Sequence, residues 1–439
     1  MTDMTENSMH HHGHSHIHED MLSVEEALTQ IISSFTTLDH EEKSILECLG
    51  QILAEDVTSP LDLPPLSNSG MDGYAVIWDD IAHSSHQNPT QLDVIGIVPA
   101  GQVSNQTVTP GSAIRIMTGA PVPNGADTVI PFEETDELER RNAGHGLDDI
   151  NINTSLPRGS NIRPSGEDVK QNELVLKSGT LIRPSEISVL ASLGLPNIKV
   201  IRRPIVSILA TGDELVQVDG NLIPGKIYDS NSAGIAASIL SAGGIPRILG
   251  IAQDTVESLN DKLEGIQGSD LVITSAGVSK GDYDVVKDVL NDKGNINFWS
   301  VRMRPAKPLA FGHLNHEDTS IPMLGLPGNP VSALVAFEMF ARPAIRQMLG
   351  LTTLDRPVVE GILTNPIFNA DERRVYARVE VTRNNGTYYA SPTGPQGSNI
   401  LTSMSKANGL AICPDDEPSR NVGDKVNIIM LDWNEEVEL

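Results

Sequence analysis

The sequence predicts a multidomain protein that combines an α/β domain with β-rich domains. The chain has 439 residues, more than a single hydrophobic core usually holds. Strand and helix patterns alternate regularly between residues 203 and 348, which is typical of a parallel sheet covered by helices on both faces. Short apolar segments separated by Pro, Gly, Asn and Thr fill residues 57–155 and return after 354, and this texture indicates strands joined by turns.

The first helix is predicted within residues 21–55, where apolar side chains recur at near-helical spacing. Ser23 precedes a pair of glutamates, and this order suits a helix N-terminus because a serine side chain caps free backbone amides. A second, shorter helix is predicted in 179–194, between a Pro-Ser-Glu start and Gly194. We expect the two helices to pack together, which makes the region between them an insertion.

These patterns predict that one domain is discontinuous. The inserted region is β-rich, and its acidic stretch at 134–149 is expected to be mostly loop. The predicted divisions are a His-rich tail (1–20), a helical linking domain (21–56 and 156–199), the inserted domain (57–155), an α/β domain (200–350) and a C-terminal β domain (351–439).

The α/β domain is predicted to be doubly wound. Its expected strands are 204–212, 246–254, 269–277 and 321–329, and its expected helices are 232–244, 255–266, 283–292 and 330–349. Because ligands of parallel sheets bind at the carboxyl ends of the strands, we expect chemistry in the loops that follow them. In the C-terminal domain, "RRVYARVEVTRNNGTYYAS" predicts a hairpin whose Asn-Asn-Gly turn supplies residues with positive φ.

Charge and cysteine content limit the partners of the chain. Lys and Arg number 31 against 58 Asp and Glu, a formal charge of −27. Nucleic acid and anionic membranes are not expected as partners, because neither would gain from counterion release on so acidic a surface. Two cysteines, no apolar run of about 20 residues and no apolar signal segment predict a cytoplasmic protein without a membrane span.

The tail holds six histidines between positions 10 and 18 and has no apolar periodicity. We expect it to be disordered, without a role in the chemistry. Imidazole also binds Zn²⁺ and Ni²⁺ well, so the tail is open to a metal-collecting role that the sequence does not decide.

The segment "LVITSAGVSKGDYD" (271–284) runs from an apolar strand into a loop of small residues and then to Asp282 and Asp284. Open backbone amides in such loops hold anions. Carboxylates just beyond would repel an anion unless a cation lies between them. The segment therefore predicts a phosphate-like ligand together with a divalent metal such as Mg²⁺.

Two other strand ends carry acidic residues. Asp213 and Glu214 follow one strand in "TGDEL", and Asp254 follows another in "AQD". Such carboxylates bind a metal or orient a ligand, but they also cap the following helix. Both interpretations stay open for Asp213 and Glu214.

A group of cations lies in "RMRPAKPLAFG", which contains Arg302, Arg304 and Lys307. Prolines stiffen the segment, and rigid cations suit an oxyanion. The alternative is a solvated basic edge. The next motif, "GLPGNPVSA", places Pro330 at the first position of a helix, where free amides favour an anion.

One motif is misleading. "GNLIPGKI" (220–227) matches the G-x-x-x-x-G-K core of a phosphate-binding loop. In a true loop of this kind a strand precedes the first Gly, and Ser or Thr follows the Lys. Here a polar segment precedes it and Ile227 follows the Lys. Ordinary turn residues explain this segment better.

Seven segments, taken together and in order, resemble the molybdopterin molybdenumtransferases, the MoeA-type enzymes that include the E domain of gephyrin. They are "NSGMDGYAV", "RIMTGAPVPNGADTVI", "IRPSGEDV", "ATGDEL", "SAGVSKGDYD", "RPAKPLAFG" and "GLPGNPVSA". The likeness extends from about residue 21 to the C-terminus. It implies the linking, inserted and molybdopterin-binding α/β domains and a C-terminal β-barrel-like domain. It also implies a homodimer with its active site between subunits.

The resemblance assigns roles to residues that match the family motifs. Catalytic roles fall on Asp72, Glu214, Asp254 and Asp284. Substrate-binding roles fall on Thr118, Arg163, Asp168, Pro327, Pro330 and Ser398, and the local motifs add Ser279, Arg304, Lys307 and Ser332 as candidate substrate-binding residues. Mg²⁺ is expected on Asp282 or Asp284. The loop usually reads Ser-Gly-Gly-Val-Ser, so Ala276 and Lys280 are departures from the pattern, and "RPAKP" replaces the more usual Lys-Pro-Gly-Lys-Pro.

The reaction that the resemblance implies is molybdenum insertion. Adenylylated molybdopterin and molybdate are the substrates, molybdenum cofactor and AMP are the products, and Mg²⁺ is required. The alternatives are the molybdopterin adenylyltransferase, whose single domain resembles 203–348 and which is also the expected pathway partner, and a non-enzymatic scaffold of the gephyrin type. The preference for molybdate over tungstate is not decided by the sequence.

Overall fold

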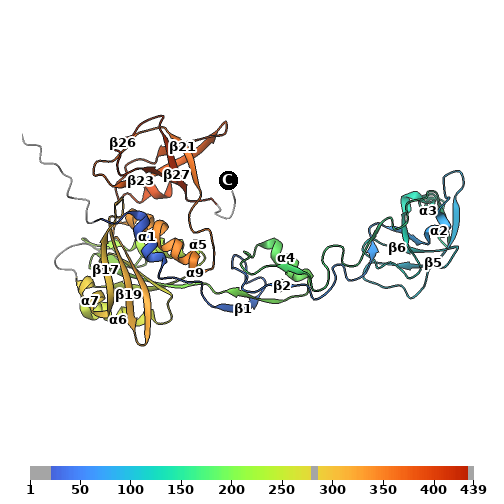
Figure 1. Ribbon diagram of the computed structural model, residues 1–439, viewed down its shortest axis with the longest axis horizontal. Coiled ribbons are helices and arrows are strands. Elements are labelled where there is room, and N and C mark those ends of the chain that lie inside the picture. The colour runs from blue at the N-terminus through green and yellow to red at the C-terminus, as the bar shows by residue number, and fades with distance from the viewer. Residues whose placement is uncertain (1–20, 278–284, 434–439) are drawn as a thin grey trace, which may run out of the picture. The chain divides into compact units, whose positions relative to one another are not determined.

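The computed structural model describes residues 21–277 and 285–433 (Figure 1). The chain divides into two compact units. The first unit contains residues up to 41, residues 50–52 and the chain from 200 onward, and the second contains residues 42–49 and 53–199. None of the helices in the described part of the chain is long and apolar enough to cross a membrane.

The α/β domain of the first unit is built on a six-stranded sheet with the order β15-β12-β16-β20-β19-β17. The strands are β12 (Ile205–Thr211), β15 (Ile245–Ala252), β16 (Leu271–Ser275), β17 (Gly294–Ser300), β19 (Pro308–His316) and β20 (Thr319–Leu326). The four predicted strands, β12, β15, β16 and β20, are parallel to one another, as expected.

Two strands of this sheet were not predicted. β19 pairs antiparallel with both β20 and β17, so the sheet is mixed rather than purely parallel. The segment that forms β17, "GNINFWS", lacks a clear two-residue alternation, and the basic motif "RPAKPLAFG" overlaps the start of β19. An antiparallel edge on a parallel sheet is common in large α/β folds.

Helices cover both faces of the sheet (Figure 1). One face packs against α6 (Val256–Leu263) and α7 (Val285–Lys293). The other packs against α1 (Val24–Ile32), α5 (Ser230–Ser241), α8 (Pro330–Ala336) and α9 (Arg342–Met348). This arrangement is doubly wound, as predicted.

The helix expected over 330–349 is interrupted by a π-helical segment, Phe337–Ala341, between α8 and α9. Pro343 lies in the first turn of α9 and has no N–H with which to continue the hydrogen-bond ladder of an α-helix. A π segment is a local way to accommodate such an interruption. The prediction of one regular long helix was therefore wrong in its detail.

The first predicted helix is much shorter than 21–55. α1 spans Val24–Ile32, and Ser23 forms a capping box with Glu26, as its sequence position predicted. After Ile32 the chain runs through serines and threonines that favour a helix poorly, and the strand β1 begins at His40. The apolar face of α1 is buried in the core of the α/β domain, whereas we expected it to pack with the helix at 179–194.

The second unit contains a five-stranded sheet with the order β7-β4-β6-β5-β8. Its strands are β4 (Gly73–Val76), β5 (Thr90–Val98), β6 (Ser112–Ile116), β7 (Thr128–Pro131) and β8 (Asp149–Ile152). The stretch at 134–149, expected to be mostly loop, holds α3 (Glu137–Asn142). The predicted helix in 179–194 is α4 (Pro184–Ser192), which is followed by Gly194 with φ +72°.

Short elements complete both units. Small ladders pair β1 (His40–Ser44) with β11 (Asn197–Ile201), β2 (Val57–Thr58) with β10 (Leu174–Leu176), β3 (Asn68–Ser69) with β9 (Ile162–Arg163), β13 (Leu215–Val216) with β14 (Ile227–Tyr228), and β22 (Ile367–Phe368) with β26 (Ser419–Arg420). The remaining short helices are α2 (Trp78–Ile81) and α10 (Thr402–Ser405).

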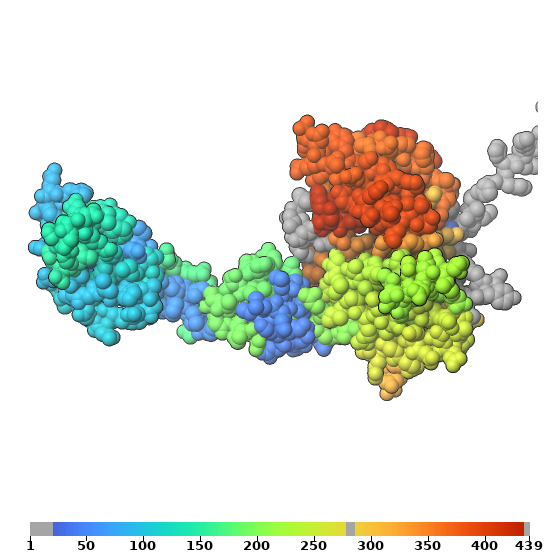
Figure 2. All heavy atoms as spheres, turned by 180° about the vertical axis from the view of Figure 1, so that it is seen from behind, coloured from blue at the N-terminus to red at the C-terminus, as the bar shows by residue number. Residues whose placement is uncertain are grey.

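The C-terminal domain is a closed five-stranded barrel. Its strands are β21 (Val358–Leu363), β23 (Arg374–Asn384), β24 (Thr387–Pro392), β25 (Gly409–Cys413) and β27 (Lys425–Met430), and the pairing of β23 with β25 closes the ring. Figure 2 shows this barrel in orange to red as a lobe beside the α/β domain. The predicted hairpin turn is present, with positive φ at Asn385 and Gly386. The multidomain α/β-plus-β fold class is thus confirmed.

One strand end of the α/β domain carries backbone strain. Ala276 directly follows β16 and has φ +84°, a left-handed conformation that costs a residue with a Cβ about 1–2 kcal/mol. The backbone is fixed there by a hydrogen bond from the Ala276 N–H to the carbonyl of Leu326, 3.0 Å away. Glycine, which the resemblance makes usual at this position, would adopt this conformation without strain.

We expect Ala276→Gly to raise the free energy of unfolding, by up to about 1 kcal/mol after the greater unfolded-state entropy of glycine is subtracted. Ala237→Gly is the matched control, because Ala237 is exposed in the middle of α5 and glycine there should destabilise by about 1 kcal/mol. The midpoints of chemical denaturation of both variants test this. Equal destabilisation by both would show that Ala276 is not strained.

Candidate functional site

Four parallel strands end at one edge of the α/β sheet. In the sheet register Thr211 of β12 lies opposite Ala252 of β15, and Ser275 of β16 lies opposite both Ala210 and Leu326. The loops that carry the four predicted motifs therefore leave the sheet side by side. This is the edge at which open α/β sheets bind ligands.

The first two loops bring acidic residues together. Asp213 and Asp254 lie in different loops, and the N–H of Asp254 donates to Asp213 Oδ1 at 3.2 Å. The side chain of Glu214 folds back over Gly212. A Cβ added to Gly212 would lie only 2.6 Å from a Glu214 carboxylate oxygen. All three carboxylates are exposed. Carboxylate oxygens in this setting suit a hard cation or the donors of a ligand.

The start of α8 faces the end of β16. The side chain of Asn231, in the first turn of α5, donates to the hydroxyl of Ser275 at 2.7 Å and to the carbonyl of Gly328 at 2.8 Å. Asn231 thereby ties the loop after β16 to the loop before α8. Its sequence context gives no sign of this role, because "DSNS" is also an ordinary helix start.

The predicted residues of the "GLPGNPVSA" motif lie around this helix start. Pro330 is the first residue of α8, while Pro327 and Ser332 are buried. The backbone N–H of Val331 donates to the carbonyl of Ser398, 3.1 Å away, on a loop of the C-terminal domain. The structure therefore brings Ser398 to the motif, although the two lie far apart in the sequence.

A buried arginine holds the Ser398 loop. Arg378 on β23 is 1% exposed, and its guanidinium donates to the carbonyls of Gln396 and Gly397 at 3.0 Å and to the Ser403 hydroxyl at 3.0 Å. Arg378 was not predicted from the sequence. A lone arginine within a predicted hairpin carries no signal of burial, because its carbonyl partners come from a loop beyond the second strand of that hairpin.

Arg378 also lines a cavity of about 440 Å³ together with Arg304. The described residues around this cavity include two arginines and no carboxylate. Burial, with the nearby charge of Arg304, lowers the pKa of Arg378 to about 10. Two cations facing a cavity without a lining carboxylate make it favourable for an anion, and a guanidinium fork suits an oxyanion.

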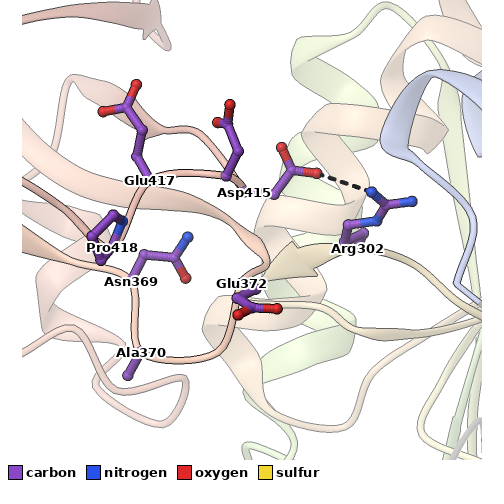
Figure 3. Close-up of a pocket in the computed structure, with 8 residues that line it drawn as sticks. Arg302, Asn369, Ala370, Glu372, Asp415, Glu417 and Pro418 are labelled. Carbon is purple, nitrogen blue, oxygen red and sulfur yellow. Dashed lines mark hydrogen bonds and ion pairs between the residues drawn. The ribbon is translucent and has the colours of Figure 1, made fainter. Parts of the chain in front are cut away.

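The three cations of "RMRPAKPLAFG" are not one cluster. Arg304 lines the cavity with Arg378, and Lys307 is exposed. Arg302 instead lines a different cavity of about 690 Å³, whose other charged residues are Glu372, Asp415, Asp416 and Glu417 (Figure 3). There it forms an ion pair with Asp415 at 3.4 Å. Arg302 therefore contacts an acidic residue in this second cavity, whereas Arg304 lines the first.

In the second unit, Asp72 and Thr118 meet. Asp72 precedes β4, Thr118 follows β6, and these two strands pair. The backbone N–H and the hydroxyl of Thr118 donate to Asp72 Oδ1 at 2.7 and 2.8 Å. These hydrogen bonds hold the pKa of Asp72 below its ordinary value. Both residues are exposed, and the low pKa keeps the Asp72 carboxylate charged, which suits contact with a substrate or a cation.

The two other candidates of the second unit lie on neighbouring surface segments. Arg163 on β9 is exposed and pairs in register with Asn68 of β3. Asp168 is exposed, and its N–H donates to the carbonyl of Leu63 at 3.0 Å. Neither side chain shows contact with the Asp72–Thr118 pair among the interactions of the described residues.

Some predictions lie beyond the described residues. Ser279, Lys280, Asp282 and Asp284 belong to the segment 278–284, which the structure does not describe. Within residues 21–277 and 285–433, no group of three or more His, Cys, Asp or Glu could hold a metal ion. In the segment "GNLIPGKI", residues 220–226 are turn and irregular chain around Gly225, whose φ is +87°, and Ile227 begins β14. This agrees with the interpretation of the segment as ordinary turn residues.

Comparison with known proteins covers almost the whole chain. Three family models match: the MoeA N-terminal region (domains I and II) over residues 22–194, the probable molybdopterin binding domain over 207–347, and the MoeA C-terminal region (domain IV) over 360–431. The solved structure of a molybdopterin biosynthesis MoeA protein from Pyrococcus horikosii is similar with a TM-score of 0.78 and 30% identity, covering 94% of this chain and 100% of that one.

Curated relatives agree with these matches. Molybdopterin molybdenumtransferase 2 of Mycobacterium tuberculosis is 38% identical over 380 residues, 85% of this chain and 90% of the relative. Molybdopterin molybdenumtransferase of Nostoc sp. is 35% identical over 424 residues, 95% of each chain. The family models over all three regions and the identity to these two relatives place this chain in the molybdopterin molybdenumtransferase (MoeA) family.

Proposed function

We propose that this chain inserts molybdenum into molybdopterin, using adenylylated molybdopterin and molybdate and releasing molybdenum cofactor and AMP. The observation that carries the proposal is the convergence of four motif loops at one edge of the α/β sheet. Both substrates are anionic, and this edge combines a helix start with backbone amides and a nearby cavity lined by two arginines. These are the groups that hold phosphate and other oxyanions.

In this proposal each group has a defined task. Amides at the start of α8 other than that of Val331, and amides of the loop after β16 beyond Ala276, bind phosphate oxygens of the adenylylated pterin, because the Val331 and Ala276 amides already donate to protein carbonyls. Arg304 and Lys307 hold molybdate, and Arg378 lines the same cavity as Arg304. Pro327, Pro330 and Ser332 lie at the start of α8. Ser398, on a loop of the C-terminal domain, contacts this helix start through its carbonyl. Thr118 orients Asp72 toward the substrates.

Mg²⁺ is proposed as the resident cation. The described donors, Asp213, Glu214 and Asp254, are exposed carboxylates of the type that Mg²⁺ prefers, but they do not form a metal cluster by themselves. A complete site therefore needs Asp282 or Asp284 and phosphate oxygens of the substrate. When bound, the cation would neutralise charge on the phosphoanhydride and on the leaving AMP.

The proposal includes the four-domain division expected from the sequence and a homodimer in which the second unit of one subunit serves the α/β domain of the other. Arg163 and Asp168 would then contact substrate from the same unit as Asp72. The upstream molybdopterin adenylyltransferase is the proposed pathway partner. The alternative that this chain is itself that enzyme would leave residues 22–194 and 360–431 without a role.

The decisive assay uses two reaction mixtures. In the first, purified chain is mixed with adenylylated molybdopterin and Mg²⁺, and molybdate-dependent AMP release supports molybdenum insertion. In the second, it is mixed with molybdopterin, ATP and Mg²⁺, and formation of adenylylated product, with no response to molybdate in the first mixture, supports the adenylyltransferase instead. Neither activity, with capture of a protein partner, supports a scaffold.

Arg304→Ala combined with Lys307→Ala should raise the molybdate concentration for half-maximal AMP release while pterin binding is spared. Loss of charge-assisted hydrogen bonds costs about 1.5–3 kcal/mol each, which corresponds to roughly ten- to hundredfold in affinity. Arg302→Ala is the control, because Arg302 lines the separate acidic cavity. If pterin affinity falls and the molybdate requirement is unchanged, these cations serve the pyrophosphate.

Asp284→Asn should impair AMP release far more than binding of the adenylylated pterin. Asparagine keeps the size of the side chain but loses the charge that a hard cation needs, so the Mg²⁺ requirement should rise. Asp288→Asn is the control, because Asp288 is nearby in the sequence and exposed on α7. A magnesium titration of turnover decides: an Asp284 variant with a normal titration has no metal role.

The chain should sediment as a homodimer at concentrations where it is active. The reason is the proposed placement of Asp72 and Thr118 in the active site of the partner subunit. Mixing an Asp72→Asn variant with a Glu214→Gln variant should restore up to about a quarter of the wild-type activity, because each mixed dimer contains one intact site. A fully active monomer would exclude this arrangement.

A further inference from the structure

A buried ion pair lies beneath the sheet of the second unit, close to the Asp72–Thr118 pair. Arg115 on β6 is 5% exposed and Glu137, the first residue of α3, is 1% exposed. Arg115 Nε lies 2.7 Å from Glu137 Oε2. Because a guanidinium keeps its charge when buried, such a residue is tolerated only with a partner. Glu137 therefore fixes the position of Arg115.

Arg115 contacts the backbone of both strands that carry the candidate pair. Its Nη1 donates to the carbonyl of Gly73 at 3.2 Å and to the carbonyl of Ile116 at 3.1 Å. Gly73 and Ile116 lie opposite each other in the β4–β6 ladder. Asp72 enters the ladder at this end and Thr118 leaves it here, so one guanidinium ties together the strand ends from which both residues project.

The aromatic side chains around Arg115 involve a third segment. The guanidinium carbon lies 5.3 Å from the centre of the Tyr74 ring and 5.5 Å from that of Phe132, within the range of cation–π attraction. The backbone N–H of Phe132 donates to the carbonyl of Asp72 at 3.1 Å. The backbone around Asp72 is therefore held by the β4–β6 ladder and by the N–H of Phe132. Arg115 contacts both the ladder and Phe132.

We infer that Arg115, fixed by Glu137, is a positioning residue that holds Asp72 and Thr118 in the arrangement required for molybdenum transfer. The inference rests on the proposed function. Asp72 and Thr118 are both exposed, and their loops bury little side-chain surface of their own. Their mutual hydrogen bonds at 2.7 and 2.8 Å thus depend on the buried Arg115–Glu137 ion pair. The acidic stretch 134–149 acquires a role as well, since its helix α3 supplies Glu137.

A purely structural role for the ion pair makes a different prediction. If Arg115 only stabilises the second unit, replacing it should change turnover and hydrogen exchange no more than the loss of any comparable ion pair there. Arg140 supplies that comparison: it lies on α3 and pairs with Asp136 at 2.7 Å and Asp149 at 2.8 Å. Its guanidinium hydrogen bonds go to these two carboxylates rather than to the strand ends beside Asp72 and Thr118.

The test compares Arg115→Met, Arg115→Lys and Arg140→Met in the full chain. Arg115→Met should lower the turnover of AMP release by about 10- to 100-fold, because small displacements of positioned groups have effects of this size. The half-saturating concentration of adenylylated pterin should change by less than about threefold. Arg115→Lys, which keeps the charge but not the fork, should recover part of the turnover, and Arg140→Met should leave it unchanged.

Hydrogen exchange measured by mass spectrometry supplies a readout that does not depend on activity. The amide of Thr118 donates to Asp72, so the peptide covering 112–120 should exchange faster in Arg115→Met than in wild type or Arg140→Met. If wild type releases no AMP, the proposed function fails while the exchange result still judges the positioning. Unchanged exchange, or turnover that falls equally in Arg115→Met and Arg140→Met, overturns the inference.

Discussion

The parallel register of β12, β15, β16 and β20 is the constraint on which the candidate site of the first unit depends. It places four strand ends at one edge, and each loop that follows can then contact its neighbours through short hydrogen bonds. Asn231 joins two of these loops, and the Asp254 amide joins two others. If the register slipped by one residue, the buried and exposed faces of every strand would exchange, and none of these contacts would survive.

The positive charges of the candidate site stand in contrast to the negative net charge of the chain. A protein with a formal charge of −27 repels anionic substrates at long range, so binding must come from local groups within a Debye length of about 8 Å at physiological salt. The two arginines that line one cavity, Arg304 and Arg378, meet this need. The guanidinium of Arg378 donates to carbonyls and a hydroxyl rather than to carboxylates. Its charge is therefore still available to a ligand, which a salt bridge would have neutralised.

The sequence predicted features whose causes are local. Ser23 starts a helix and Gly194 follows one because capping is decided within a few residues, and the Asn-Asn-Gly turn follows from its own backbone preference. Features that depend on distant partners were missed. β17 is recognisable only beside β19, and the burial of Arg378 depends on a loop that follows the next strand of the barrel. The separation of Arg302 from Arg304 depends on acidic residues much further along the chain.

The short strand β18 (Met303–Arg304) has a consequence for how the C-terminal barrel is joined to the rest of the first unit. It belongs by sequence to the α/β domain, yet it pairs with β23 of the barrel. Arg304 thus takes its position from a domain to which it is not covalently adjacent. A barrel from a distant relative could be exchanged into this chain only if it offered a matching edge to β18. In recombination between family members, the barrel and the segment around Arg304 are therefore inherited as one module, although the α8 and α9 helices lie between them in the sequence.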